Sequence, residues 1–283
     1  MTLRSLLIVG TASLIALTGC RSFDVSSAVS LATTSAVNIA QASQTLSPEQ
    51  EYYLGRAVGA RILAKYPLLD NWKLTEYVNN IGQTLVLFSE QPVTHGGYHF
   101  AVLDTMEKNA FACPGGMILI TKGLIMTAQN EDELAAVIAH EIGHIVHRDG
   151  VSSIQQSRMT EALTRTGTQA AATYGGSTVA TLVSVFEGSI DDVFKTIVVN
   201  GYSRSQELAA DEAALSYLAK AGYEPSAVKT LLEAMRQGTG GGMLSTHPGT
   251  DDRIVEVIKK MPATPPNPVA FEARKARFRA ALQ

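Results

Sequence analysis

Cysteine, tryptophan and long runs of one charge are scarce in this chain of 283 residues. Two cysteines cannot form the disulfide framework of a small secreted domain, and only one tryptophan is present. The formal net charge is −3, from 23 basic and 26 acidic residues, and no long basic run occurs. Nothing therefore indicates nucleic-acid binding. No internal repeat indicates a solenoid or an array.

The first twenty residues, MTLRSLLIVGTASLIALTGC, have the pattern of a secretory signal. Arg4 precedes an apolar stretch, and small residues precede Cys20. The last four letters resemble a bacterial lipobox, which implies removal of residues 1–19 and lipidation of Cys20. Arg21 rather than aspartate follows, which favours the outer membrane, with the domain in the periplasm. An ordinary signal peptide, or an uncleaved anchor with an accidental cysteine, is the alternative.

Three histidines and a glutamate interrupt the apolar run AAVIAHEIGHIVHRDG at residues 135–150. The run suits a helix, on which His140 and His144 project the same way from adjacent turns. Two neutral imidazoles so placed can bind one zinc ion, and a glutamate in the position of Glu141 acts as general base on the metal's water. The alternative is a pair of buried histidines satisfied by hydrogen bonds.

Helical patterns dominate the chain, and 46% of its residues are hydrophobic, which allows a sizeable core. The histidine-bearing helix is expected to end at Gly150, in the left-handed conformation. Strands are expected at residues 98–104 and 115–125, the second leading into a short helix, with a loop at 109–116 between them. The predicted fold class is α+β, predominantly helical, with a small sheet beside the histidine-bearing helix.

The chain is expected to comprise a tether at residues 20–45, one domain at 46–262 and a helical tail at 263–283. Residues 167–186 carry no charge and are numerous enough to raise the question of a membrane span. They are rich in glycine, serine and threonine and lack flanking basic clusters, which favours a packed helix or a mobile flap. An inner-membrane span remains the alternative.

A catalytic zinc ion needs a third protein ligand. Three other histidines are expected at the surface or just outside the site: His95, His99 and His147. The segment SRSQELAAD offers Glu207, with Asp211 one turn further along the same helix face. If Glu207 binds the metal, Asp211 can accept a hydrogen bond from a ligating histidine and fix its tautomer. The spacing is equally consistent with a solvated acidic helix face.

Four separated segments resemble one family, in the right order and over most of residues 47–260. The zinc metallopeptidases related to HtpX, BepA and LoiP contain segments similar to NAFACPGGMILITKGLI, HEIGH, SRSQELAAD and STHPGTDDR. The resemblance implies a gluzincin endopeptidase with a zincin-like fold and one zinc ion per chain, nearest to the LoiP type in the lipoprotein branch. It places the metal ligands at His140, His144 and Glu207, the general base at Glu141 and a ligand-orienting aspartate at Asp211.

The segment STHPGTDDR contributes two further candidates, His247 and Arg253. Pro248 restricts His247 towards an extended conformation. From a loop, His247 can donate a hydrogen bond to the developing oxyanion, or it can occupy the open zinc position and hold the enzyme latent. Arg253 can orient a nearby carboxylate. A surface turn with Asp251 as a helix cap is the alternative.

The expected reaction is hydrolysis of internal peptide bonds in misfolded or stalled envelope and outer-membrane proteins. An edge strand is expected to pair with the extended substrate, through Met117, Ile118, Leu119 and Ile120. The rival function is that of a chaperone-like factor that works with the outer-membrane assembly machinery and keeps a structural or latent zinc ion. Cys113 has no intrachain partner once Cys20 is acylated, and we expect it to be buried.

Overall fold

The computed structural model describes residues 46–152, 190–236, 246–263, 265 and 267–283. The signal, the lipidation site, the tether and the uncharged stretch 167–186 lie outside the described residues, so those assignments stay predictions. Within the described part of the chain, no helix combines the length and the apolar character that a bilayer span requires.

Three strands form one sheet: β1 (His99–Leu103), β2 (Ala110–Cys113) and β3 (Met117–Thr121). Their order is β1-β3-β2, with β1 parallel and β2 antiparallel to β3. Two glycines with positive φ, Gly115 at 74° and Gly116 at 104°, reverse the chain between β2 and β3. A small sheet within a mostly helical domain confirms the predicted fold class.

Two expectations about this sheet are wrong. Residues 110–113, expected in a loop, form β2. The sequence did not indicate a strand here because all four residues are buried and lack the alternation of polar and apolar residues that marks a half-exposed strand. Met117, Ile118, Leu119 and Ile120 do not form an edge strand. They lie in β3, the central strand, which pairs with β1 on one side and β2 on the other and has no free edge for a substrate.

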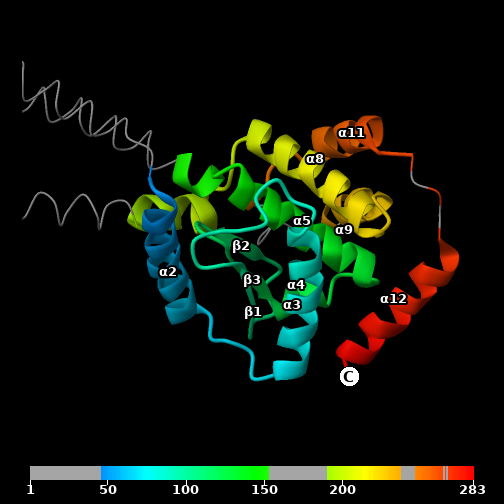
Figure 1. The fold of residues 1–283 in the computed structure, drawn as a ribbon, viewed down its shortest axis with the longest axis horizontal. Coiled ribbons are helices and arrows are strands. Elements are labelled where there is room, and N and C mark those ends of the chain that lie inside the picture. Colours follow the sequence, from blue (N-terminus) through cyan, green and yellow to red (C-terminus); the bar gives the residue numbers. More distant parts are fainter. Residues whose placement is uncertain (1–45, 153–189, 237–245, 264, 266) are drawn as a thin grey trace, which may run out of the picture.

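Helices surround the sheet (Figure 1). They are α2 (Pro48–Lys65), α3 (Trp72–Val86), α4 (Lys122–Ile125), α5 (Glu131–Val146), the π-helical turn η1 (Thr196–Asn200), α8 (Arg204–Ala221), α9 (Ser226–Arg236), α11 (Thr250–Lys260) and α12 (Pro268–Ala281). In Figure 1 the sheet lies between α2 and α3, while α8, α9 and α11 gather at one end. The local signals that start and stop these helices are present, such as the capping box at Ser203 and the left-handed Gly222 that closes α8.

Helix α5 forms the centre of the domain. Every residue from Glu131 to Ile145 is buried, and the helix packs against α3, α8, α9, α12 and the sheet. Gly143 brings α5 close to α8, because a Cβ atom at this position would lie 3.1 Å from the Cα of Ala210 and 3.2 Å from its carbonyl oxygen. The two helices that carry the candidate metal ligands therefore meet almost backbone to backbone.

Helix α12 anchors the start of α5. The Arg274 guanidinium is buried, and its Nε donates to Asp132 Oδ2 at 3.0 Å, while its Nη2 lies 2.9 Å from Asp132 Oδ1. Arg277 pairs with Glu131, which also accepts hydrogen bonds from the hydroxyls of Tyr77 and Tyr223. Two of the three carboxylates in the first turn of α5, Glu131 and Asp132, are thus neutralised by arginines of the C-terminal helix.

Replacing Arg274 with alanine is expected to lower the free energy of unfolding by about 3 kcal/mol, because it leaves the Asp132 carboxylate buried without its cation. Urea unfolding followed by circular dichroism measures the change. The matched control is Lys275→Ala on the same helix, whose ammonium pairs with Glu272 at the surface and whose loss is expected to cost less than about 0.5 kcal/mol. Equal midpoints for the two variants would show that α12 contributes little to stability.

Cys113 is a buried free thiol, as expected from the sequence. It lies in β2, within a cluster of buried hydrophobic residues that includes Leu54, Phe111 and Leu119. Burial raises the pKa of the Cys113 thiol to about 12. The thiol is therefore protonated at neutral pH, and its part in the fold is that of a small apolar side chain.

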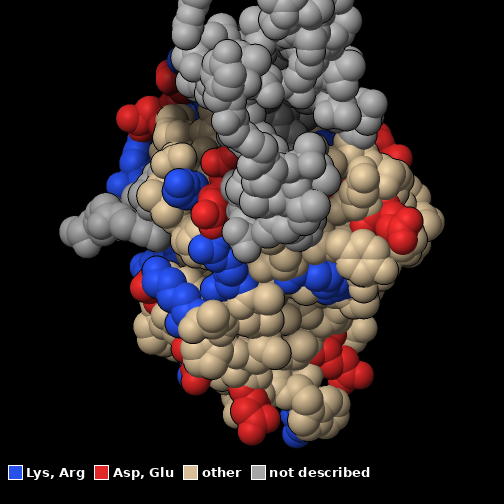
Figure 2. Space-filling model, turned by 90° about the vertical axis from the view of Figure 1, so that its left-hand side faces the viewer, with Lys and Arg blue, Asp and Glu red and all other residues tan. Residues whose placement is uncertain are grey.

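The side of the molecule that carries α2 presents mixed charge. Figure 2 shows Lys and Arg side chains together with Asp and Glu on this face, between wide areas of other residues. Helix α2 also takes part in two ion pairs with other segments, Arg61–Asp191 and Arg148–Glu51. The described residues of this face therefore agree with the near-balanced charge of the sequence.

Candidate metal centre

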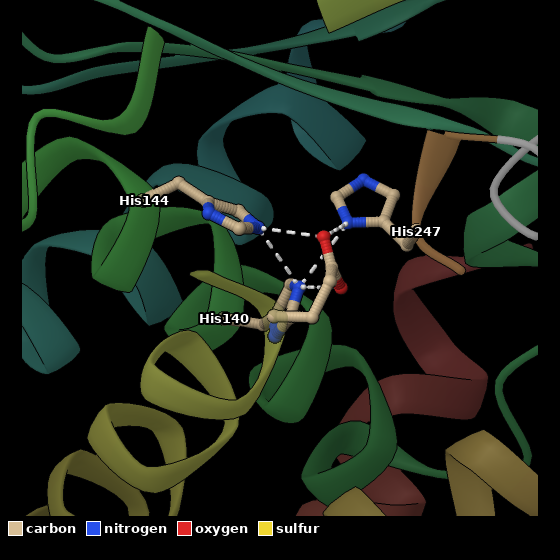
Figure 3. Close-up of side chains that lie close together, drawn as sticks. His140, His144 and His247 are labelled. Carbon is tan, nitrogen blue, oxygen red and sulfur yellow. Dashed lines mark hydrogen bonds and ion pairs between the residues drawn. The ribbon is translucent and has the colours of Figure 1, made fainter. Parts of the chain in front are cut away.

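Four side chains converge on one point inside the domain: His140, His144, Glu207 and His247. All four are buried, and one nitrogen or oxygen from each lies within 4.8 Å of the others. The Nε2 atoms of His140 and His144 are 3.1 Å apart, and His247 Nδ1 lies 3.3 Å from His140 Nε2. Figure 3 shows the three imidazoles turned towards one another around a carboxylate.

Three separate elements supply these side chains. Residues four apart on α5 lie on one face, so His140 and His144 point the same way. Glu207 comes from the first turn of α8, the helix that Gly143 allows to approach α5. His247 comes from the segment before α11, where Gly201 packs so closely that a Cβ atom there would lie 2.3 Å from the Thr246 carbonyl oxygen.

Carboxylates orient both histidines of α5. Asp211 Oδ1 lies 2.9 Å from His140 Nδ1, and Asp149 Oδ2 lies 2.7 Å from His144 Nδ1. A proton on each Nδ1 leaves each Nε2 with a lone pair, and these two lone pairs face each other at 3.1 Å. Two facing lone pairs repel unless a proton or a metal ion lies between them, so this pair of tautomers can accept a metal ion.

The surroundings of the four donors are strongly negative. Burial opposes protonation of His140, but its hydrogen bonds with Asp211 and Glu207 raise its pKa to about 9. Burial also opposes ionisation of Glu207, yet the neighbouring His247 and His140 hold its pKa far below the ordinary value. Burial lowers the pKa of His144, although Asp149 acts in the opposite direction. The site therefore stabilises positive charge at its centre.

Arg253 ties two acidic residues of α8, Glu207 and Asp211, together. Its guanidinium is buried and donates to both oxygens of Asp211, at 2.7 and 2.8 Å, while its Nη1 lies 2.6 Å from Glu207 Oε2. The same Nη1 donates to the His247 carbonyl oxygen at 3.2 Å. Arg253 thus orients two carboxylates, which agrees with the role that the sequence indicated for it, and it also holds the segment that carries His247.

Glu141 lies beside the four donors without a hydrogen-bond partner. Both of its carboxylate oxygens are buried and unpaired among the described residues, and His247 Nε2 is 3.7 Å from Oε1. A buried unpaired carboxylate is costly, and structural roles seldom leave one in place. Glu141 therefore lies next to the group of four with two acceptor oxygens that no hydrogen bond from a described residue uses.

The remaining candidate histidines lie outside the site, as expected from their spacing. His95, His99 and His147 are exposed, and none belongs to the group of four.

Sequence reasoning missed two contributors, Asp149 and Tyr202. After α5, Arg148 rather than the expected Gly150 takes the left-handed conformation, with φ 56°, and the following Asp149 then meets His144. Tyr202 stacks on the other side of the site, with its ring 4.0 Å from the His144 ring and nearly parallel to it. Neither residue belongs to a spaced motif, so only its position next to HEIGH or SRSQE could have pointed to it.

The donor set fits a divalent transition metal. Imidazole nitrogens with one carboxylate oxygen are ligands that zinc accepts in catalytic sites. Both oxygens of Glu141 have no hydrogen-bond partner among the described residues, and a water molecule bound to such a cation would satisfy them.

The sequence profile of peptidase family M48 matches residues 73–261, which include all four donors and Glu141. The chain belongs to this family. The family resemblance seen in the sequence is thereby confirmed. M48 membership implies a metal ion, and the group of four could hold one.

Three relatives illustrate the range of the family. The chain is 28% identical to the beta-barrel assembly-enhancing protease of Yersinia pestis over 240 residues, which cover 81% of this chain and 47% of that protein. It is 27% identical to metalloprotease LoiP of Escherichia coli K12 over 194 residues, 68% of this chain and 70% of LoiP. It is 28% identical to the mitochondrial metalloendopeptidase OMA1 of Schizosaccharomyces pombe over 200 residues, 66% of this chain and 53% of OMA1. The chain thus spans about half the length of the assembly-enhancing protease.

Proposed function

We propose that this M48 protein is a zinc-dependent endopeptidase. The observation that carries the proposal is the buried, unpaired Glu141 carboxylate beside the converging donors of His140, His144 and Glu207. A structural metal site needs these three donors but not Glu141, whereas hydrolysis needs the three donors and Glu141 as well.

The chain's own residues divide the reaction between them. A bound zinc ion would polarise the scissile carbonyl and lower the pKa of a water molecule. Glu141 accepts the proton of that water as it attacks the carbonyl carbon, and then delivers it to the leaving amine nitrogen as the peptide bond breaks. Asp211 and Asp149 keep the two imidazoles in the tautomer that presents Nε2 to the site.

Strand β2 is the proposed pairing partner for an extended substrate. The free side of β1 is covered, since Asn79 bonds both the amide and the carbonyl of Phe100 and the Leu69 amide donates to Val102. On β2, no described strand lies beyond the edge that faces away from β3, and β2 packs against α5. An added peptide strand there would run alongside the metal helix.

Metal dependence tests the proposal. Purified protein incubated with β-casein is expected to produce internal fragments, to lose this activity after dialysis against a chelator, and to regain it with one equivalent of Zn²⁺ per chain. Gel electrophoresis and mass spectrometry of the fragments measure the outcome. Cleavage that survives complete removal of metal, verified by elemental analysis, would refute a zinc mechanism.

His247 is proposed as a latch rather than an oxyanion donor. Its Nδ1 lies 2.9 Å from Glu207 Oε1, inside the group of donor atoms, and its backbone is held by Arg253. In this position its imidazole takes the place that a substrate carbonyl needs. Displacement of the segment would open the site.

The sign of one mutational effect separates the two roles of His247. If it is a latch, His247→Ala is expected to raise the initial rate of casein cleavage about fivefold, because a larger fraction of molecules is competent. If it is the oxyanion donor, the same change lowers kcat by about 100-fold. His95→Ala, at an exposed position, is the control for loss of a histidine.

We further propose that the protein is a lipoprotein of the outer membrane, anchored through Cys20, that degrades misfolded or stalled envelope proteins. Support comes from the signal and lipobox pattern and from relatives named for beta-barrel assembly. The words 'assembly-enhancing' in those relatives' name support a second candidate function, assistance to the outer-membrane assembly machinery without cleavage. Recovery of the protein with inner-membrane markers in sucrose gradients would contradict the location.

A further inference from the structure

Tyr202 is fixed beside the metal centre by contacts that do not involve its hydroxyl. Its backbone N–H donates to the Thr246 carbonyl at 3.1 Å, and its ring stacks on the His144 ring with an interplanar angle of 23°. The preceding residue, Gly201, has φ 77°, a conformation that favours glycine. The ring also lies 5.8 Å from the His247 ring, so it borders two of the four donors.

The hydroxyl of Tyr202 is buried and has no hydrogen-bond partner among the described residues. Phenylalanine would give the same stacking on His144 without burying an unpaired polar group, so the hydroxyl does not serve stability. The two oxygens of Glu141 are unpaired in the same site. A peptide substrate bound at the site would offer hydrogen-bond partners to both groups.

The hydroxyl is protonated at neutral pH, because a phenol ordinarily has a pKa of about 10. The group is therefore a neutral hydrogen-bond donor. A donor is what a carbonyl oxygen needs as it acquires negative charge during attack by water.

We propose that Tyr202 is a catalytic residue that donates a hydrogen bond from its hydroxyl to the carbonyl oxygen of the scissile peptide as that oxygen becomes an oxyanion. The proton stays on the tyrosine, and no covalent bond of Tyr202 forms or breaks. This inference rests on the proposed peptidase function. His247 is the other candidate for the role. Its Nδ1 lies 2.9 Å from Glu207 and its Nε2 lies 3.7 Å from Glu141, so both ring nitrogens already face carboxylates of the site.

The substitution Tyr202→Phe tests the role because it retains the ring and removes only the hydroxyl. Zinc content and melting temperature are expected to stay at wild-type values. The kcat for a fluorogenic peptide is expected to fall by about 100-fold with KM nearly unchanged, as found when one oxyanion donor is removed. Affinity for a phosphinic peptide, whose tetrahedral phosphorus carries oxygens like those of the oxyanion, is expected to weaken by a similar factor in a calorimetric titration.

Binding of the uncleaved peptide supplies the second readout. In a Glu141→Gln background, which prevents turnover, Tyr202→Phe is expected to leave the affinity for the intact peptide unchanged. The control is Tyr98→Phe, which removes a phenol that donates to the Gln91 carbonyl and not to the metal centre. It is expected to leave kcat and phosphinate affinity unchanged.

Three results would overturn the inference: wild-type kcat in Tyr202→Phe, equal losses of affinity for the intact peptide and the phosphinate, or loss of zinc from the variant. The last two would assign Tyr202 to general binding or to support of His144. A wild-type protein that cleaves no peptide when loaded with zinc would refute the proposed function itself. Cleavage by wild type and by Tyr202→Phe at the same rate would refute this inference alone.

Discussion

Replacing Glu141 with glutamine is expected to lower casein cleavage by at least about 100-fold, because glutamine cannot accept the proton of the attacking water. The change preserves the size of the side chain and does not alter the metal ligands. The variant is therefore expected to bind one zinc ion per chain, like the wild type. Elemental analysis and an assay of initial rates on the same preparation measure both quantities.

The control for this experiment lies on the same helix as Glu141 but outside the site. Glu133→Gln changes a buried glutamate in the first turn of α5, whose carboxylate accepts from the Gln129 amide. It is expected to retain activity. If Glu141→Gln cleaves casein as fast as the wild type, Glu141 is not the base, and the rival function of an assembly factor with a structural metal gains support.

Replacing Glu207 with alanine is expected to weaken zinc binding by more than about 100-fold and to abolish cleavage. Loss of a residue that merely orients a ligand already costs about 10- to 100-fold in metal affinity, and Glu207 is placed as a ligand itself. The substitution also leaves Arg253 with Asp211 as its remaining carboxylate partner. Competition with a chromophoric chelator measures the zinc affinity.

Helix α8 provides the matched control, Glu212→Ala. Glu212 lies one residue beyond Asp211 but is exposed and pairs with Lys260 at the surface. Its loss is expected to change neither zinc affinity nor activity. Zinc affinity at the wild-type level in Glu207→Ala would show that the metal is held by the histidines alone, and the gluzincin assignment of the ligands would be wrong.

The features that could be predicted from the sequence are those fixed by local spacing. The four-residue interval between His140 and His144 depends on a single helical turn, and the structure places both imidazoles on one face of α5. The place of Glu207 was indicated by a family resemblance, because no spacing rule reaches across some sixty residues.

The features that escaped prediction depend on contacts between distant segments. Strand order is one case: Met117–Thr121 has a normal strand pattern, and only pairing with both β1 and β2 makes it central. The left-handed Arg148 is another, since it is held by Leu46 and Glu51 from the start of the domain. Asp149 reaches His144 only because of that turn.

The close approach at Gly143 has a consequence for any change of metal. The distance between the two imidazoles of α5 and the Glu207 carboxylate depends on how closely α5 and α8 approach each other. The lack of a side chain at Gly143 allows that close approach. A larger residue there would widen the gap for every ligand at once, without touching any of them. The spacing of the metal ligands, and with it the radius of the ion that they accept, thus depends on Gly143, a residue that does not contact the ion.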